Sequence, residues 1–299
     1  MSDITVLTGG TGWVGRNFLS EIQENYSPAE IQERVLIFGS KEGEIIINKY
    51  RSKEFVKIPV YPLSSLNNML KKKPGIRLIH SAFLRKEKLN KLGTQRYIQE
   101  NKEITNCVRD LLKSSSNSKS IVISSGAATL FEKHKKSIKE DPYGFLKLNE
   151  ENKLNEVSEC MKLRIYGLTG QFITNPELFA LGSFLISAKE KKPIEIKSKF
   201  QVIRSYGFAS DISKFGLRWL NSNLVADSIF AATETLSIYE LAQKITTIYN
   251  LKPVIADIDN NLQKDEYTCD TRKFKKYLNS FNIKPTNLAK QITETFKHI

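Results

Sequence analysis

The sequence TGGTGWVG occupies residues 8–15 and stands between a short apolar run and a long stretch of helical spacing. The spacing of its glycines is typical of a turn that leads directly from a strand into a helix and binds a phosphate. Gly9 permits a tight turn, Gly12 lets a ligand approach the backbone, and Gly15 allows the helix to pack against the strand. The N–H groups at the start of such a helix bind phosphate oxygens. The segment therefore predicts a dinucleotide-binding turn, to which Thr11, Trp13 and Val14 also contribute.

Short β-rich runs alternate with helical patterns through the first half of the chain. We expect strands at Ile4–Thr8, Val35–Gly39, 55–60, 77–81, 120–124 and 161–165, and helices at 13–26, 64–72, 94–115 and from Pro142 onward. Strands that alternate with helices form parallel sheets through right-handed crossovers. The pattern predicts an α/β fold, with a doubly wound parallel-sheet Rossmann domain over residues 1–166.

The elements after residue 167 are shorter and mixed. We expect helices at 176–190, 209–221 and 237–249, strands at 193–197 and 201–204, and two amphipathic helices within 270–299. This part predicts a smaller mixed α/β C-terminal substrate domain over residues 167–299, which contributes some strands and helices back to the Rossmann domain.

Composition narrows the function classes. The 299 residues are 40% hydrophobic and 26% charged, which is typical of a globular protein, and 46 Lys and Arg against 32 Asp and Glu favour anionic ligands. Because the lysine runs lack interleaved aromatic residues, we expect solvated surface and no nucleic-acid partner. The three cysteines lie far apart, so we expect neither disulfides nor a metal. With no export signal or membrane-length apolar segment apparent, we expect a cytoplasmic protein without a membrane partner.

The end of the second expected strand bears on the choice of cofactor. In many dinucleotide-binding proteins a carboxylate at this position binds the ribose hydroxyls of NAD. Here the strand ends in Phe38-Gly39-Ser40-Lys41, without a carboxylate. Ser40 and Lys41 can instead bind the 2′-phosphate of NADP. We therefore predict NADP, with NAD as the alternative if Lys41 faces solvent.

A second group of residues is suited to proton transfer. Tyr143 and Lys147 are four residues apart, which places them about 6 Å from each other on one helix face. A tyrosine hydroxyl ordinarily titrates near 10, and a neighbouring ammonium favours its charged form. Upstream, a buried strand ends in Ser124 and Ser125, at the edge where open α/β sheets bind ligands. We predict a catalytic set of Ser125, Tyr143 and Lys147.

Together these motifs resemble the extended short-chain dehydrogenase/reductase family, in particular its nucleotide-sugar epimerase, dehydratase and reductase branch. The resemblance covers nearly the whole chain and includes Leu78-Ile79-His80-Ser81-Ala82, Leu163-Arg164-Ile165-Tyr166-Gly167 and residues 204–211. It implies that Ser125 orients the substrate, Tyr143 is the acid/base, and Lys147 anchors the cofactor ribose. It also implies cofactor contacts from Ala82 and Asn101, a diphosphate contact from Arg204, a core role for His80, and a homodimer formed by the helices near 97–115 and 143–159.

Some positions depart from the family pattern and leave several functions open. Gly126-Ala127 stands where dehydratases carry carboxylates, and Pro62-Leu63, Leu130-Phe131 and Gly167 also differ from the family's usual residues. The leading hypothesis is an NADPH-dependent reductase of a nucleotide-bound keto-sugar, within polysaccharide biosynthesis. The alternatives are a nucleotide-sugar epimerase with tightly bound NAD and a non-catalytic dinucleotide-binding protein.

Overall fold

A computed structural model describes residues 3–48 and 55–299 and divides the chain into two compact units. The first unit comprises Met1–Arg164 and Gly216–Ile229, and the second comprises Ile165–Phe215 and Phe230–Ile299. The chain thus passes from one unit to the other three times. The assignment of functional domains at 1–166 and 167–299 stays a prediction.

The first unit is built around an eight-stranded sheet. Its strands are β1 (Ile4–Thr8), β2 (Val35–Gly39), β3 (Gly43–Asn48), β4 (Phe55–Pro62), β5 (Ile76–His80), β6 (Lys119–Ser125), β7 (Glu159–Ile165) and β11 (Ser228–Phe230). Its helices are α1 (Trp13–Asn25), α2 (Pro28–Arg34), η1 (Leu63–Ser65), α3 (Leu66–Leu70), α4 (Glu87–Leu92), α5 (Thr94–Ser114), α6 (Gly126–His134) and α7 (Pro142–Asn155), and α9 (Ala209–Leu220) ends in it.

The strand order is β11-β7-β6-β5-β1-β2-β4-β3. β1 pairs in parallel with both β2 and β5, and β3 pairs with β4 in the antiparallel sense. The mostly parallel order confirms the doubly wound Rossmann fold predicted from the alternation. From β1 the chain adds strands on one side and then returns to place β5 on the other. The direction of winding therefore switches between β1 and β5, and ligands bind outside the carboxyl ends of the strands at such a point.

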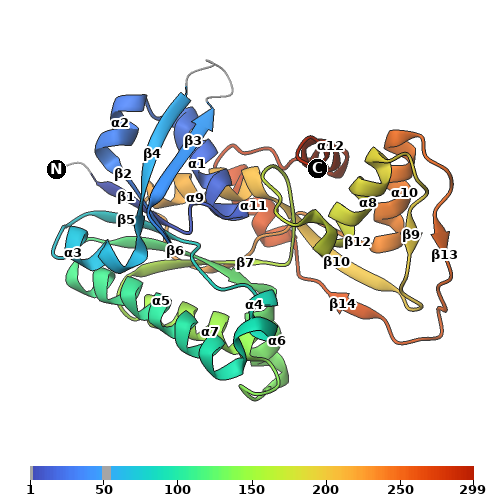
Figure 1. Cartoon of the computed structure of the whole chain (residues 1–299), viewed down its shortest axis with the longest axis horizontal. Coiled ribbons are helices and arrows are strands. Elements are labelled where there is room, and N and C mark those ends of the chain that lie inside the picture. Colours follow the sequence, from blue (N-terminus) through green and yellow to red (C-terminus); the bar gives the residue numbers. More distant parts are fainter. Residues whose placement is uncertain (1–2, 49–54) are drawn as a thin grey trace. The chain divides into compact units, whose positions relative to one another are not determined.

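Helices cover both faces of this sheet. Figure 1 shows α3, α5 and α7 on one face and α1 on the other. The core under α3 and α5 is formed by apolar side chains from the central strands and from the helices, including Val6, Leu78, Val122, Val108 and Leu111. Two of these, Val108 and Leu111, share an apolar face of α5 with Ile98 and Ile104 at spacings of three and four, and the sequence predicts that this face pairs with a second copy. They are buried within the chain, so the predicted homodimer contact would depend on other residues of α5.

The second unit has its own sheets and core. Its remaining elements are β8 (Gly167–Thr169), η2 (Pro176–Leu178), α8 (Ala180–Lys189), β9 (Glu195–Ile196), β10 (Val202–Phe208), β12 (Glu234–Ser237), α10 (Ile238–Tyr249), β13 (Ile255–Ala256), β14 (Asp265–Tyr267), α11 (Arg272–Ser280) and α12 (Leu288–Phe296). β10 pairs with β8, β12 and β14. Leu185, Ile194, Leu241, Ile245 and Ile292 form part of a buried cluster that joins α8, α10 and α12.

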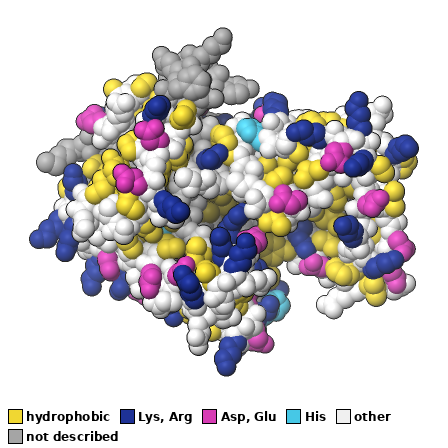
Figure 2. Space-filling view, viewed as in Figure 1, with side chains coloured by type: hydrophobic (Ala, Val, Ile, Leu, Met, Phe, Trp, Pro, Cys, Tyr) yellow, Lys and Arg dark blue, Asp and Glu magenta, His cyan; other side chains and the backbone are white. Residues whose placement is uncertain are grey.

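The structure contains elements that the sequence pattern did not indicate. α2 begins at a capping box, in which Ser27 and Glu30 satisfy each other's backbone N–H groups. β3 lies at the edge of the sheet, and α6 follows β6 without an intervening loop. The three lysine runs, at 71–73, 133–136 and 189–192, are exposed. Figure 2 shows basic side chains interspersed with acidic ones over the visible face. Throughout the described residues, no helix has the length and hydropathy needed to cross a membrane.

Candidate active site

The predicted phosphate turn lies at the switch point of the sheet, between β1 and α1. Gly9 has a φ of +73°, and a Cβ there would lie 2.6 Å from the backbone nitrogen of Ala82, in the loop after β5. A Cβ at Gly15 would lie 2.3 Å from the carbonyl oxygen of Gly9. The glycines therefore let two loops and a helix approach one another closely.

The start of α1 is suited to an anion. Gly12 is the N-cap residue, no side chain caps the helix, and the first turn carries no acidic residue. Such a start leaves the positive end of the helix dipole uncompensated by the protein. Thr11 and Gly12 are exposed, and Trp13 and Val14 are half-buried. At the end of neighbouring β2, Ser40 and Lys41 are exposed. Their contacts with a cofactor stay predictions.

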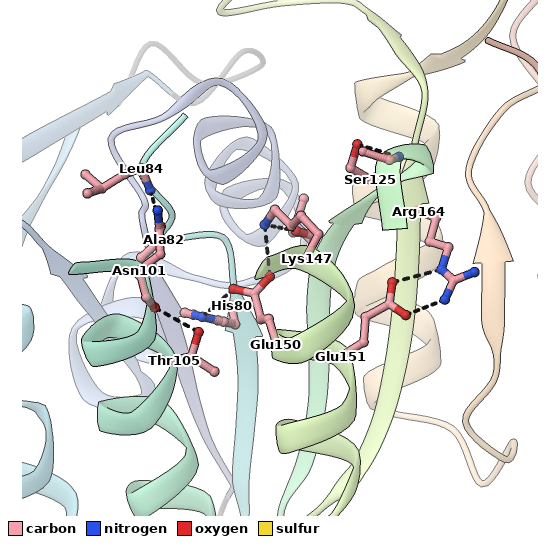
Figure 3. Close-up of polar contacts among 12 residues, drawn as sticks. His80, Ala82, Leu84, Asn101, Thr105, Ser125, Lys147, Glu150, Glu151 and Arg164 are labelled. Carbon is pink, nitrogen blue, oxygen red and sulfur yellow. Dashed lines mark hydrogen bonds and ion pairs between the residues drawn. The ribbon is translucent and has the colours of Figure 1, made fainter. Parts of the chain in front are cut away.

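Asn101 supports the loop after β5. Its side chain is fully buried on α5, and its amide oxygen accepts a hydrogen bond of 2.8 Å from the N–H of Leu84. The amide nitrogen donates to the carbonyl of Tyr97 at 3.0 Å. Figure 3 shows Asn101 beneath this loop, which also carries Ala82. The structure thus gives Asn101 a loop-holding role, and a direct cofactor contact by either residue stays a prediction.

Tyr143 and Lys147 both lie on α7, as the spacing predicted. The N-cap of the helix is Asp141, whose carboxylate accepts a hydrogen bond of 2.9 Å from the N–H of Gly144, and Pro142 is the first helical residue. Tyr143 is half-buried and Lys147 is buried. The first turn of α7 thereby fixes where the tyrosine stands relative to the sheet.

The Lys147 ammonium is enclosed by three groups. It donates to the carbonyl of Ile123 on β6 at 2.9 Å and to the carboxylate of Glu150 at 2.9 Å. The same nitrogen lies 3.7 Å from the centroid of the Phe83 ring, which is a cation–π contact. Phe83 also packs edge-on against Tyr143, with ring centroids 5.8 Å apart. Phe83 therefore links the two residues that the sequence predicted to act together.

Glu150 extends the contacts of Lys147 toward β5. Its second carboxylate oxygen lies 3.0 Å from Nε2 of His80, and Nδ1 of His80 lies 2.6 Å from the hydroxyl oxygen of Thr8. Thr8 and His80 face each other as the last residues of β1 and β5. Burial alone would raise the pKa of Glu150, but the Lys147 ammonium and the His80 ring outweigh it, and the pKa is lowered. Glu150 therefore stays ionised beside Lys147 (Figure 3).

The neighbouring carboxylate on the same helix points elsewhere. Glu151 forms a two-bond pair with Arg164 of β7, at 2.8 Å and 2.6 Å. Arg164 also donates to the hydroxyl of Thr129 on α6 at 3.0 Å. This pair ties α7 to β7 and α6, and Figure 3 shows it on the side of the helix away from His80. Glu150 and Glu151 thus serve different parts of the structure.

The predicted substrate-orienting serine ends β6. Ser125 is the N-cap of α6, and its hydroxyl oxygen accepts a hydrogen bond of 3.2 Å from the N–H of Ala127. The hydroxyl of Ser124 is buried and has no hydrogen-bond partner among the described residues. Ser125 and Lys147 are connected through the strand, since Lys147 binds the carbonyl of Ile123 two residues earlier. The glycine turn, the serines and the lysine therefore belong to the same edge of the first unit.

Arg204, the predicted diphosphate ligand, lies on β10 in the second unit. It forms an ion pair of 2.6 Å with Asp265 and donates to the carbonyl of Asp265 at 2.8 Å. These contacts fix the guanidinium against β14. Across the described residues, no cluster of three or more His, Cys, Asp or Glu side chains could hold a metal ion.

Two residues of the site were not singled out from the sequence. Glu150 stands three residues after Lys147, and this spacing places both on one helix face. The spacing could have indicated from the sequence that the two side chains pair. Phe83 follows the β5 motif and had no comparable signal, because its partners come from a helix 60 residues later. His80 is buried and hydrogen-bonded, as expected.

Comparisons with known proteins identify the fold. No family model matches the sequence, and no curated protein matches it. Among solved structures, UDP-N-acetylglucosamine 4-epimerase from Bacillus cereus is similar over 99% of both chains, with a TM-score of 0.70 and 18% identity. UDP-glucose 4-epimerase from Thermotoga maritima is similar over 98% of this chain and 97% of its own, with a TM-score of 0.70 and 15% identity.

A third solved structure belongs to the same group. dTDP-glucose 4,6-dehydratase from Bacillus anthracis, in complex with NAD, is similar over 99% of this chain and 96% of its own, with a TM-score of 0.68 and 15% identity. The chain therefore has the fold of nucleotide-sugar epimerases and dehydratases. This fold is the one expected from the family that the sequence motifs resemble.

Proposed function

We propose that this protein is an enzyme of the extended short-chain dehydrogenase/reductase family that acts on a nucleotide sugar with a nicotinamide dinucleotide. The observation that carries the proposal is the edge of the parallel sheet in the first unit. There the glycine turn after β1, the serines that end β6, and the Tyr143 and Lys147 of α7 occur together. A non-catalytic dinucleotide-binding protein would need the turn alone.

The residues present fit a dinucleotide. The glycine turn is uncapped by side chains and free of acidic residues, and at Gly12 a Cβ would meet only the carbonyl oxygen of Gly9, at 3.4 Å. The turn would hold the pyrophosphate, Ser40 and Lys41 the adenosine end, and Lys147 the ribose near the reacting ring. When bound, the cofactor supplies the acceptor and donor of a hydride.

The chain's own residues would move the proton. Tyr143 would take the proton from a sugar hydroxyl as that carbon loses its hydride, and would return it when the hydride is restored. Ser125 would orient the same sugar oxygen by a hydrogen bond. Lys147, fixed by Ile123 and Glu150, would stabilise the tyrosinate that forms in between. Arg204 would bind the diphosphate of the nucleotide.

Two reactions use this set of residues. In an epimerase the hydride returns to the opposite face of the same carbon, so the cofactor stays bound and is not consumed. Two of the similar solved structures are 4-epimerases of UDP-sugars, and this supports epimerisation with NAD as the leading proposal, ahead of the NADPH-dependent reductase expected from the sequence. The reductase remains the second candidate, because Ser40 and Lys41 follow β2 where an NAD-binding carboxylate would be expected.

Two assays separate the two reactions. Purified protein is incubated with UDP-glucose or UDP-N-acetylglucosamine without added cofactor, and the sugar is analysed by NMR for inversion at C4. Inversion without net change in cofactor absorbance at 340 nm supports the epimerase. For the reductase, a nucleotide-bound keto-sugar must be reduced with one NADPH oxidised per product. Protein that binds neither NAD nor NADP would refute both proposals.

The homodimer is part of the same proposal. α5 and α7 lie side by side on one face of the sheet, and Ile98 and Ile104 of α5 are only partly buried. These side chains could pack against a second copy. Light scattering at micromolar concentration should give about twice the monomer mass of 34.1 kDa, and a monomer would contradict the assembly.

A further inference from the structure

The buried side chains Thr8, His80, Glu150 and Lys147 form a continuous line of polar contacts. It begins at the backbone of the loop after β5, where the N–H of Ala82 lies 3.4 Å from the Thr8 hydroxyl. From there the contacts run through His80 and Glu150 to Lys147 at 2.6, 3.0 and 2.9 Å. Each of the four residues is at most 5% exposed. The line is therefore buried along its length.

The Thr8 hydroxyl oxygen accepts from the backbone N–H of Ala82 and lies 2.6 Å from Nδ1 of His80. The other ring nitrogen of His80 faces the carboxylate of Glu150. One Glu150 oxygen thus lies 3.0 Å from Nε2 of His80, and the other accepts a hydrogen bond of 2.9 Å from the Lys147 ammonium. The Glu150 carboxylate and the Lys147 ammonium form a buried ion pair in which the two charges compensate each other.

We propose that Glu150 is the positioning residue of Lys147: it holds the ammonium in place at the sheet edge before a nicotinamide dinucleotide binds. This inference rests on the proposed function, because the role of Lys147 in cofactor binding comes from it. The position of Glu150 is set in turn by His80, at the end of β5, and the side chain of Phe83 covers the remaining side of the ammonium. Three neighbouring elements thus fix one cation.

Holding the ammonium in place before the cofactor binds should increase the affinity for the cofactor, and this effect can be measured. A long lysine side chain that must be ordered on binding reduces affinity, and one that is already ordered does not. In a Glu150→Gln variant the shape is kept, but the ammonium loses its counter-ion and its tether. We expect the dissociation constant of the cofactor to rise by about tenfold, the loss of one charge-assisted hydrogen bond.

Glu151 provides a matched control. It is a glutamate one residue along the same helix, equally buried, and it pairs with Arg164 and not with Lys147. Glu151→Gln should lower the thermal stability through the loss of that pair, while the cofactor dissociation constant stays within about twofold of wild type. Equal weakening by the two variants would mean that Glu150 has only a structural role.

The decisive experiment is a double-mutant cycle with Lys147→Met. Cofactor binding to wild type, E150Q, K147M and the double variant is measured by calorimetry with NAD and with NADP, and unfolding temperatures are recorded for the same four proteins. If Glu150 acts through Lys147, E150Q has no further effect on binding in the K147M background. The double variant should also unfold at a higher temperature than K147M, because K147M leaves a buried carboxylate without its cation.

The outcomes separate this inference from the proposed function. Wild type that binds a dinucleotide, with E150Q and K147M effects that add independently, overturns the positioning role and leaves the function standing. Wild type that binds neither dinucleotide rejects the function and the positioning role together. A double variant no more stable than K147M shows that the two charges are not coupled, and it overturns the inference whatever the binding data show.

Discussion

Two alanine substitutions in the glycine turn should separate folding from ligand binding. Gly15→Ala should lower the stability of the fold, and Gly12→Ala should lower the affinity for the cofactor. At Gly15 a Cβ would lie 2.3 Å from the carbonyl oxygen of Gly9 and 2.8 Å from the Cα of Gly10, both of which are backbone atoms. Gly15→Ala must therefore push α1 away from the turn by about 1 Å, an overpacking that costs about 1–3 kcal/mol. The helical preference of alanine returns up to about 1 kcal/mol. We expect the unfolding temperature to fall by about 2–8 °C.

Gly12→Ala tests the other side of the same turn. Gly12 has φ −80° and ψ 170°, a conformation that alanine adopts freely, and its Cβ would make only an ordinary contact of 3.4 Å with Gly9. The unfolding temperature should stay within about 1 °C of wild type. The added methyl group would occupy the space expected for the pyrophosphate, so cofactor affinity should fall by about tenfold or more.

Differential scanning fluorimetry and calorimetric titration with NAD and NADP measure both quantities on the same samples. G12A protein that binds the dinucleotide as tightly as wild type would refute the placement of the pyrophosphate at Gly12. A loss of stability in G12A as large as that in G15A would refute the packing argument itself.

Three further predictions concern catalysis, cofactor choice and acid stability. Tyr143→Phe should lower turnover by about 100- to 10,000-fold with little change in cofactor affinity, and steady-state rates within a few-fold of wild type would remove Tyr143 from its role. Replacing Ser40 by Asp and Lys41 by Ala should lower the ratio of NADP to NAD affinity by about tenfold. Glu42→Gln, in the same loop between β2 and β3, is the control. An unchanged ratio in the double variant would show that Lys41 faces solvent. Because the pKa of Glu150 is lowered from its usual 4.5, its stabilising effect is present above that value and is lost as the pH falls through the lower folded value. The difference in unfolding temperature between wild type and E150Q should therefore shrink below about pH 4.5, and a constant difference from pH 7 to pH 3 would contradict the ionised pair.

The parts of the site that could be predicted from the sequence are those that depend on local spacing. The glycine turn follows from residues 8–15 alone, since strand, turn and helix are consecutive. Tyr143 and Lys147 share a helix because four residues make about one turn. The same spacing also places Glu150 on the face of Lys147, but Glu150 was not among the predicted site residues. Local geometry therefore accounts for the predicted turn and for the pair of Tyr143 and Lys147.

The parts that could not be predicted depend on which strands become neighbours. His80 contacts Glu150 across 70 residues of sequence, and this contact exists because β5 lies between β1 and β6. The hydrogen bond from Leu84 to the Asn101 amide oxygen likewise depends on how the loop after β5 folds over α5, which the sequence spacing does not indicate. β3 was not predicted because it forms by pairing with β4 at the edge of the sheet. The apolar run of β3 does not by itself indicate that this partner strand is available.

The division of the chain into two units affects how the protein folds during synthesis. The first unit is interrupted after residue 164 and is completed only by residues 216–229, which include the start of the edge strand β11. At about 5–20 residues per second, a ribosome needs several seconds to make the intervening segment and those last residues. During that time the nascent sheet ends at β7, with an unpaired edge. We expect newly made chains to rely on chaperones over this interval, which a contiguous first domain would avoid.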